Sequence, residues 1–154
     1  QRPEVLRGWQ MLHLAGSSPD ADLAAAYRHA EIPAVVLPFL HRIGLAWGAA
    51  DLAVSRAGAN SVAEAAANAV PTLFLPYPYH RDLHQRLNAE PLVRMGGATM
   101  TDDRIEPEAN MTSVLPRLQE LLDDPGKRER MRAVLRSSPP ADAAGVIAET
   151  LLAG

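Results

Sequence analysis

A short turn of small residues follows an apolar segment and has the chemistry of a phosphate seat. The turn is Arg56-Ala-Gly-Ala-Asn60, and it comes directly after the apolar residues 51–55. Gly58 lets a ligand approach the main chain, and a helix beginning after the turn would present unpaired N–H groups with positive dipole character. The turn lacks the Lys-Ser/Thr pair of a P-loop and the three glycines of a dinucleotide fingerprint. Taken alone, its motif is therefore a weak signal for phosphate binding.

The same stretch has a purely structural interpretation. Ser61 and Glu64 have the spacing of a capping box, in which the glutamate returns to the first N–H groups of its own helix. A carboxylate used in this way binds no ligand. The residues alone leave the phosphate seat and the capping box both open.

Polar side chains crowd the stretch that follows a second apolar segment, residues 72–77. They are His80, Arg81, Asp82, His84, Gln85 and Asn88. Glutamine and histidine pair well with sugar hydroxyls, whereas a solvated loop with Asp82 as N-cap explains the same residues without a ligand. Two such polar clusters after neighbouring apolar segments favour a binding site over two unrelated loops.

Apolar and helical segments alternate from residue 9 to about residue 100. We expect strands within residues 9–15, 34–39, 51–55 and 72–77, and helices within residues 21–30, 41–48, 61–69 and 82–95. Uniformly apolar strands separated by helices are typical of a parallel sheet that is covered on both faces. Sheets of this kind bind ligands at the carboxyl ends of their strands, where both polar clusters fall.

The C-terminal part of the sequence changes to polar helices. We expect them at residues 107–123, 125–136 and 139–153, each with proline at its first position. The predicted fold class is therefore α/β, a Rossmann-like parallel sheet with flanking helices. We expect one domain over residues 1–154, with a sheet core at about 9–100 and C-terminal helices at about 107–153.

Composition argues against several other functions. The 154 residues carry a formal net charge of -3, which gives no positive field for nucleic acid. No cysteine is present, and His80 and His84 lack the partners of a zinc site, so we predict no metal site and no cofactor. No apolar run is long enough to span a membrane, and we expect a soluble protein.

Three stretches, taken together, closely resemble the C-terminal domain of the MurG family. They are residues 50–67, 70–79 and 82–89, and they contain Ser-Arg-Ala-Gly-Ala-Asn-Ser, Phe-Leu-Pro-Tyr-Pro-Tyr and Asp-Leu-His-Gln-Arg-Leu-Asn-Ala in the family's order. That family transfers N-acetylglucosamine from UDP-N-acetylglucosamine to undecaprenyl-pyrophosphoryl-MurNAc-pentapeptide, which converts lipid I to lipid II in peptidoglycan synthesis. The resemblance implies a GT-B glycosyltransferase of two Rossmann-like domains, with this chain as the donor-binding C-terminal domain.

The resemblance also implies which residues bind the donor. In chain order they are Leu40, Arg56, Gly58, Ala59, Asn60, Ser61, Glu64, His84 and Gln85. The main chain of Leu40 would bind uracil, and the carboxylate of Glu64 would accept hydrogen bonds from both ribose hydroxyls. Main-chain N–H groups of residues 58–61 would lie near the diphosphate, and Arg56 would support their turn.

Further expectations concern the sugar and the reaction. His84 and Gln85 would hold sugar hydroxyls and select N-acetylglucosamine over its 4-epimer. The transfer would invert the anomeric centre without a covalent enzyme intermediate, and the catalytic base would come from an N-terminal domain that this chain lacks. We expect the full-length protein to lie peripherally on the cytoplasmic face of the plasma membrane through that domain, and this fragment alone to be inactive.

The sequence departs from the family pattern in two places. Ala69 stands where the family usually has glycine. A left-handed turn there would cost about 1 kcal/mol unless Asn68 adopted it instead. The chain also begins after the point where the family's first C-domain strand and its Gly-Gly-Ser-Gln-Gly loop lie, so we expect a fragment of a longer protein.

Two alternative functions stay open. One is a non-catalytic donor-binding subunit of a split glycosyltransferase, whose partner chain supplies the acceptor half. The other is a nucleotide-sugar 2-epimerase, which needs acid and base carboxylates around the sugar. Beyond Asp82 and Glu90 the second polar cluster offers few such carboxylates.

Overall fold

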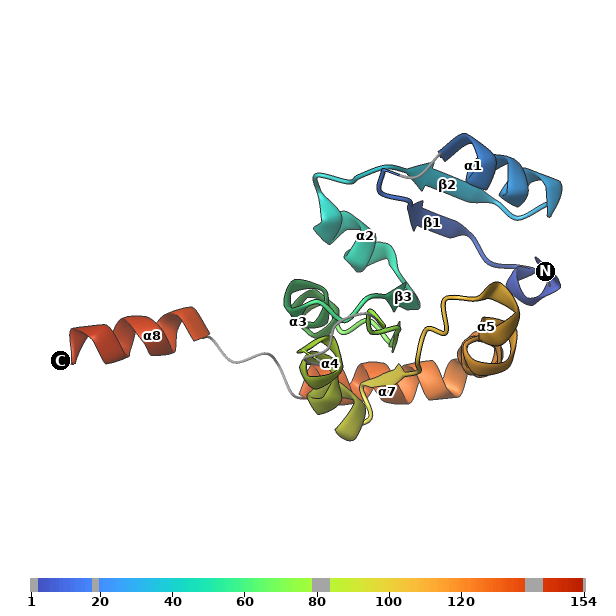
Figure 1. Ribbon diagram of the computed structural model, residues 1–154. Coiled ribbons are helices and arrows are strands. Elements are labelled where there is room, and N and C mark those ends of the chain that lie inside the picture. Colours follow the sequence, from blue (N-terminus) through green and yellow to red (C-terminus); the bar gives the residue numbers. More distant parts are fainter. Residues whose placement is uncertain (1–2, 18–19, 79–83, 138–142, 154) are drawn as a thin grey trace.

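The chain forms two parallel β-sheets with helices packed on them (Figure 1). The computed structural model describes residues 3–17, 20–78, 84–137 and 143–153, and the structural statements below concern these residues. The fold class is α/β, as the alternation of apolar and helical segments predicts.

The first sheet has two strands. After a short 3-10 helix, η1 (Pro3–Leu6), the chain enters β1 (Met11–Leu14), which pairs in parallel with β2 (Ala34–Leu37). The helix α1 (Asp20–His29) connects the two strands. A parallel pair needs such a crossover, because the chain must return to the end of the sheet from which it started.

The second sheet has three strands in the order β3-β4-β5, all parallel. They are β3 (Ala53–Ser55), β4 (Thr72–Phe74) and β5 (Ala98–Met100), and the crossovers contain α3 (Ala59–Ala67) and α4 (His84–Arg94). The strand β5 is not predicted from the sequence, because it follows Gly96-Gly97 and its apolar residues are only Ala98 and Met100.

Helices cover both faces of the second sheet, as the apolar sequence of its central strand predicts. Successive residues of a strand point to opposite faces, and Leu73 and Phe74 in β4 are both fully buried. Phe74 shares one cluster with Ala65 of α3 and Ala89 of α4, whose small side chains let these helices lie close to the sheet. Leu73 packs on the other face, against Leu121 of the C-terminal helices.

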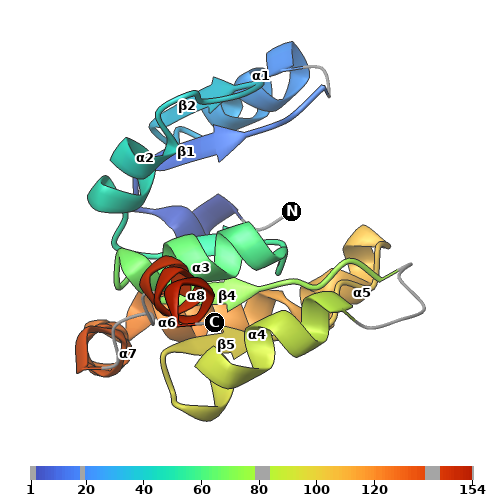
Figure 2. The ribbon, with the colours of Figure 1, turned by 90° about the vertical axis from the view of Figure 1, so that its left-hand side faces the viewer.

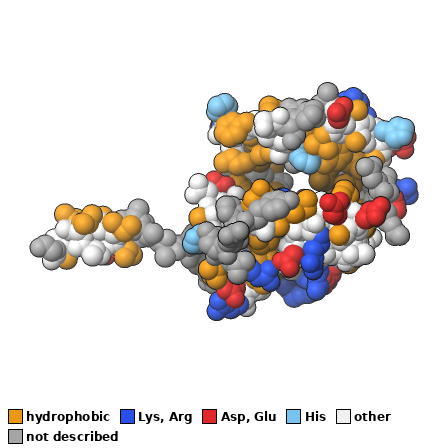
Figure 3. All heavy atoms as spheres, viewed as in Figure 1, with side chains coloured by type: hydrophobic (Ala, Val, Ile, Leu, Met, Phe, Trp, Pro, Cys, Tyr) orange, Lys and Arg blue, Asp and Glu red, His pale blue; other side chains and the backbone are white. Residues whose placement is uncertain are grey.

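The strands form two sheets where the sequence predicts one. In both ribbon views β1 is the strand of the first sheet that lies nearer to the second sheet (Figures 1 and 2), yet β1 and β3 form no ladder. Leu12, Leu14 and Val54 on these strands are exposed, and Figure 3 shows hydrophobic side chains bordering a hollow between the two parts. The chain passes from β2 to β3 through α2 (Ile43–Ala49), so this division is invisible in the order of the segments.

The C-terminal part is helical, as predicted, with different boundaries. Its helices are α5 (Pro107–Ser113), α6 (Leu115–Asp123), α7 (Pro125–Ser137) and α8 (Ala143–Leu152). The single helix predicted at 107–123 is broken at Val114, and Pro116 in the first turn of α6 explains the break, because proline has no N–H for the preceding turn. Figure 1 shows α8 standing apart from the rest. None of the described helices has the length and hydropathy to cross a membrane.

Candidate functional site

The turn after β3 leads into a helix whose first N–H groups are open. Gly58 is the N-cap of α3, with φ -63° and ψ 151°, and no side chain caps the helix. The first helical hydrogen bond runs from the N–H of Val62 to the carbonyl of Gly58, at 3.0 Å. Ala59 and Asn60 are exposed. The N–H groups of the first helical turn are therefore available to a ligand, and a helix N-terminus favours an anion.

The space above Gly58 is empty of protein. A Cβ atom built on Gly58 would meet no heavy atom within 4 Å, and its φ angle lies in a region that every residue adopts. Neither backbone strain nor a neighbouring side chain therefore requires glycine at this position. A ligand that approaches the main chain would make use of this open space.

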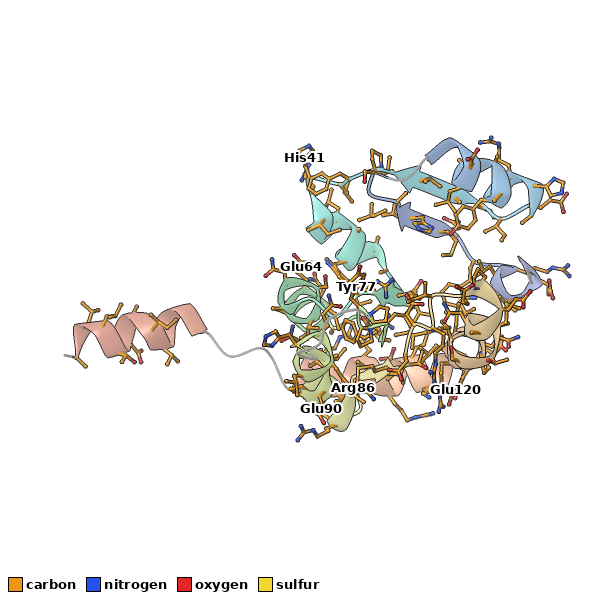
Figure 4. The ribbon with its side chains drawn as sticks, in the orientation of Figure 1. His41, Glu64, Tyr77, Arg86, Glu90 and Glu120 are labelled. Atoms are coloured by element: carbon orange, nitrogen blue, oxygen red, sulfur yellow. The ribbon has the colours of Figure 1, made fainter. Side chains whose placement is uncertain are left out.

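Glu64 does not cap its own helix, so the capping-box interpretation is wrong. The helix begins at Ala59, two residues before the predicted start, which places Ser61 and Glu64 inside the helix. The Oε2 atom of Glu64 instead accepts a hydrogen bond of 2.9 Å from the indole Nε1 of Trp47 on α2. Glu64 lies on the side of α3 that is turned toward α2 (Figure 4).

Arg56 braces the ends of the three strands. Its Nη1 atom donates a hydrogen bond of 3.1 Å to the carbonyl of Leu75, just after β4. Its Nη2 atom lies 2.7 Å from Oδ2 of Asp103, which follows β5, and its guanidinium carbon lies 5.7 Å from the ring centroid of Tyr77. These contacts fix the start of the turn relative to the neighbouring strands.

Asp103 is held in its ionised form. Its Oδ1 atom accepts hydrogen bonds of 2.8 Å from the side chain of Asn110 and from the N–H of Ile105. The bond from Asn110, and then those from Ile105 and Arg56, lower the pKa of Asp103 against the opposing effect of burial. The ion pair with Arg56 therefore persists at neutral pH.

Helix α4 fastens the turn from the other side. The side-chain oxygen of Gln85 accepts the N–H of Ala57 at 3.2 Å and the N–H of Tyr77 at 2.9 Å. The amide nitrogen of Asn88 donates to the carbonyl of Ala57, also at 3.2 Å. Ala57 is fully buried, so these side chains satisfy main-chain groups that water does not reach.

Most of the predicted donor-binding residues gather around this turn. Gly58, Ala59, Asn60, Ser61 and Glu64 lie on α3 and its cap, with Arg56 before them. Gln85 contacts the turn directly, and His84 is the exposed first residue of α4.

The other predicted residues lie elsewhere. Leu40 belongs to the loop after β2, where the rings of Phe39 and His41 meet edge to face at 5.0 Å. The loop is linked to the turn through α2, whose Trp47 reaches Glu64. From the second polar cluster, His80, Arg81 and Asp82 fall outside the described residues.

A shallow cavity of about 240 Å³ adjoins the turn. Its lining residues are Pro76, Tyr77, Pro78, Gln85, Arg86, Asp102, Asp103 and Arg104. Arg86 and Asp102 form an ion pair of 2.7 Å on its wall, and Figure 4 labels Tyr77 and Arg86. Within the described ranges, no three His, Asp or Glu side chains come close enough together to hold a metal ion.

Three side chains of this site were not assigned a role from the sequence. The sequence alone assigns Trp47 no role, although a buried indole N–H usually has an acceptor and Glu64 is the acceptor here. Asn88 was recognised as polar without a role, and Asp103 was overlooked because it follows the unpredicted strand β5.

An open helix N-terminus at the carboxyl edge of a covered parallel sheet defines a Rossmann-like ligand-binding domain. Residues 3–145 match the family model described as the glycosyltransferase family 28 C-terminal domain, and the chain belongs to that family. The resemblance inferred from the three sequence stretches is thereby confirmed.

Similar proteins carry the name UDP-N-acetylglucosamine--N-acetylmuramyl-(pentapeptide) pyrophosphoryl-undecaprenol N-acetylglucosamine transferase. The protein from Pelobacter propionicus is 38% identical over 140 residues, which cover 91% of this chain and 36% of that protein. The one from Pseudomonas syringae pv. syringae is 37% identical over 134 residues, covering 87% of this chain and 37% of that protein. The chain thus spans a little over a third of the length of these relatives.

A solved structure supports the fold assignment. The crystal structure of Acinetobacter baumannii MurG matches with a TM-score of 0.83 and 27% sequence identity. The match covers 100% of this chain and 47% of the MurG chain. The predicted fold class, the C-terminal domain of a two-domain glycosyltransferase, is confirmed by this match and by the family model.

Proposed function

We propose that this chain is the UDP-N-acetylglucosamine-binding part of an inverting N-acetylglucosaminyltransferase. In the full-length protein it would transfer the sugar to a lipid-linked muramyl-pentapeptide acceptor and so convert lipid I to lipid II. The observation that carries the proposal is the open N-terminus of α3 above Gly58, with the Glu64 carboxylate on the same helix. The names of the relatives favour this transferase over a 2-epimerase or a split donor-binding subunit.

The nucleotide would lie across the start of α3. N–H groups of residues 58–61 would bind the diphosphate, because they have no acceptor within the helix and point along the positive end of its dipole. Glu64 would accept hydrogen bonds from the two ribose hydroxyls. The main chain of Leu40 would bind the uracil edge.

The sugar would lie toward the start of α4. The side-chain oxygen of Gln85 is already used by two main-chain N–H groups, so its NH₂ group is the part that would donate to a sugar hydroxyl. His84, the exposed residue before it, would bind a second hydroxyl. These two side chains would distinguish N-acetylglucosamine from its 4-epimer.

In the reaction, an acceptor hydroxyl attacks the anomeric carbon while the bond from that carbon to the diphosphate oxygen breaks. The hydroxyl proton passes to a base outside this chain, and UDP leaves with the bonding electrons. N–H groups at the start of α3 stabilise the negative charge that grows on the leaving diphosphate. Because the acceptor is lipid-linked, the full-length protein would work peripherally at the cytoplasmic face of the membrane.

Calorimetry on Glu64→Ala in the full-length protein tests this proposal. The variant loses the hydrogen bonds to the charged Glu64 carboxylate, and bonds of this kind contribute about 1.5–3 kcal/mol. UDP affinity should therefore be roughly ten- to a hundredfold lower. Glu90→Ala is the matched control, because Glu90 lies on α4 and pairs only with the exposed Arg94 among the described residues. Equal UDP affinity for wild type and Glu64→Ala would remove the ribose role.

A further inference from the structure

We propose that Trp47 is a positioning residue for the donor, because its indole holds the Glu64 carboxylate in the orientation that receives the ribose. The proposal deepens the proposed function and rests on the ribose role of Glu64. Trp47 itself would touch no substrate. It would act by fixing the side chain that does.

The indole is held in place by the core. Trp47 is only 9% exposed and belongs to the cluster that contains Ala57, Ala65 and Phe74. A large ring packed in this way has one orientation, so the direction of its N–H is fixed as well. That N–H lies 2.9 Å from Oε2 of Glu64.

Glu64 depends on this contact for its orientation. No Lys or Arg in the described part of the chain forms an ion pair with Glu64, and its one side-chain hydrogen bond there comes from Trp47. A glutamate side chain has several rotatable bonds, and ordering it on binding costs affinity. The indole orders it in advance, before any ligand arrives.

The remaining acceptor capacity of Glu64 suits a diol. An ionised carboxylate has about four lone-pair positions, and the indole N–H occupies one of them. Both lone-pair positions of Oε1 and one position of Oε2 remain to accept hydrogen bonds from a ligand. Two neighbouring hydroxyls, such as those of a ribose, match these two oxygens.

Helix α2 also connects the Trp47–Glu64 hydrogen bond to the loop that contains Leu40, which is proposed to bind uracil. The helix begins at Ile43, shortly after Leu40, and carries Trp47 into contact with α3. One short rigid element therefore sets both the loop proposed to bind uracil and the carboxylate proposed to bind ribose.

The test compares UDP with 2′-deoxy-UDP in calorimetry on the full-length protein. Wild type should prefer UDP, because only UDP offers both hydroxyls to Glu64. Trp47→Phe keeps an aromatic ring and removes the N–H. It should bind UDP about fivefold more weakly, a value in the range of one hydrogen bond. Affinity for 2′-deoxy-UDP, which offers Glu64 only one hydroxyl, should fall less, so the preference for UDP should shrink. Trp9→Phe is the control, because Trp9 stacks under Arg128 on α7.

Trp47→Phe loses ring volume as well as the N–H, and a second variant separates these two effects. Replacing Trp47 with benzothienylalanine keeps the size of the indole and exchanges its N–H for sulfur, so it should reproduce the loss of ribose preference. If both variants keep the wild-type preference for UDP, Trp47 has only a packing role and the proposal is overturned. If wild type shows no preference for UDP, the ribose role of Glu64 itself fails.

Discussion

Arg56 and Asp103 form an ion pair of 2.7 Å that joins the residue after β3 to the loop after β5 across the end of β4. Arg56 also donates to the carbonyl of Leu75, so one guanidinium contacts the carboxyl ends of all three strands. The turn that begins at Arg56 is thus held by its neighbours at the edge of the sheet where ligands bind in this class of fold.

The variant Asp103→Asn should lower the free energy of unfolding at pH 7 by about 1 kcal/mol, since Arg56 is half exposed and solvent weakens the pair. The pKa of Asp103 is lowered by folding, so its stabilisation is complete above the ordinary value of 3.8 and is lost as the pH falls through the lower folded value. Urea titrations at pH 7 and at about pH 2.5 should therefore show a difference from wild type that shrinks in acid.

Asp102→Asn is the control for this measurement. Asp102 pairs with Arg86 at the same distance of 2.7 Å, but both side chains are about half exposed. Its loss should cost less than about 0.5 kcal/mol. If Asp103→Asn and Asp102→Asn lower the free energy of unfolding equally, the ion pair of Arg56 contributes no more than an exposed pair.

The variant Ala69→Gly should stabilise the protein. Ala69 has φ +50° at the end of α3, whereas Asn68 has φ -94° and does not take over the left-handed position. Relief of this strain, less the extra freedom that glycine has in the unfolded chain, predicts a gain of roughly 0.5–1 kcal/mol. Thermal or urea unfolding measures it. Ala63→Gly, in the middle of the helix, should be destabilising, and a loss of stability in Ala69→Gly would refute the strain.

Two variants of Gln85 separate its structural role from its proposed sugar role. Gln85→Met removes the oxygen that accepts the N–H groups of Ala57 and Tyr77, and it should cost about 1–3 kcal/mol of stability. Gln85→Glu keeps an acceptor and removes the NH₂ donor. It should fold with near wild-type stability and lose more affinity for UDP-N-acetylglucosamine than for UDP, because the added charge acts on both ligands and the lost donor acts only on the sugar. Equal loss for both ligands would contradict the sugar role.

The sequence predicts the architecture well where its signals are long or strongly apolar. The largely apolar segment around β4 and the small residues of α3 correctly indicate a parallel sheet covered on both faces. The strand β5 is missed because Ala98 and Met100 are its only apolar residues. The division into two sheets is missed because local periodicity does not show which strands are neighbours. The break at Val114 is also missed, because residues 107–123 show one helical pattern apart from Pro116.

The site was predictable to a similar degree. The turn and Glu64 follow from motif and resemblance. The capping-box spacing gave a wrong prediction, because the helix begins two residues earlier and Ser61 is therefore not its N-cap. The bond from Trp47 to Glu64 crosses 17 positions, so it depends on tertiary packing that local patterns do not contain.

Gly58→Ala tests most directly whether the turn holds a diphosphate. A methyl group on Gly58 meets no protein atom within 4 Å and fits the observed φ of -63°, so the free energy of unfolding should stay within about 1 kcal/mol of wild type. The same methyl group would occupy the space above the helix N-terminus, and calorimetry on the full-length protein should show UDP affinity at least tenfold lower, or about 1.4 kcal/mol. Wild-type UDP affinity in a well-folded Gly58→Ala protein would contradict the account.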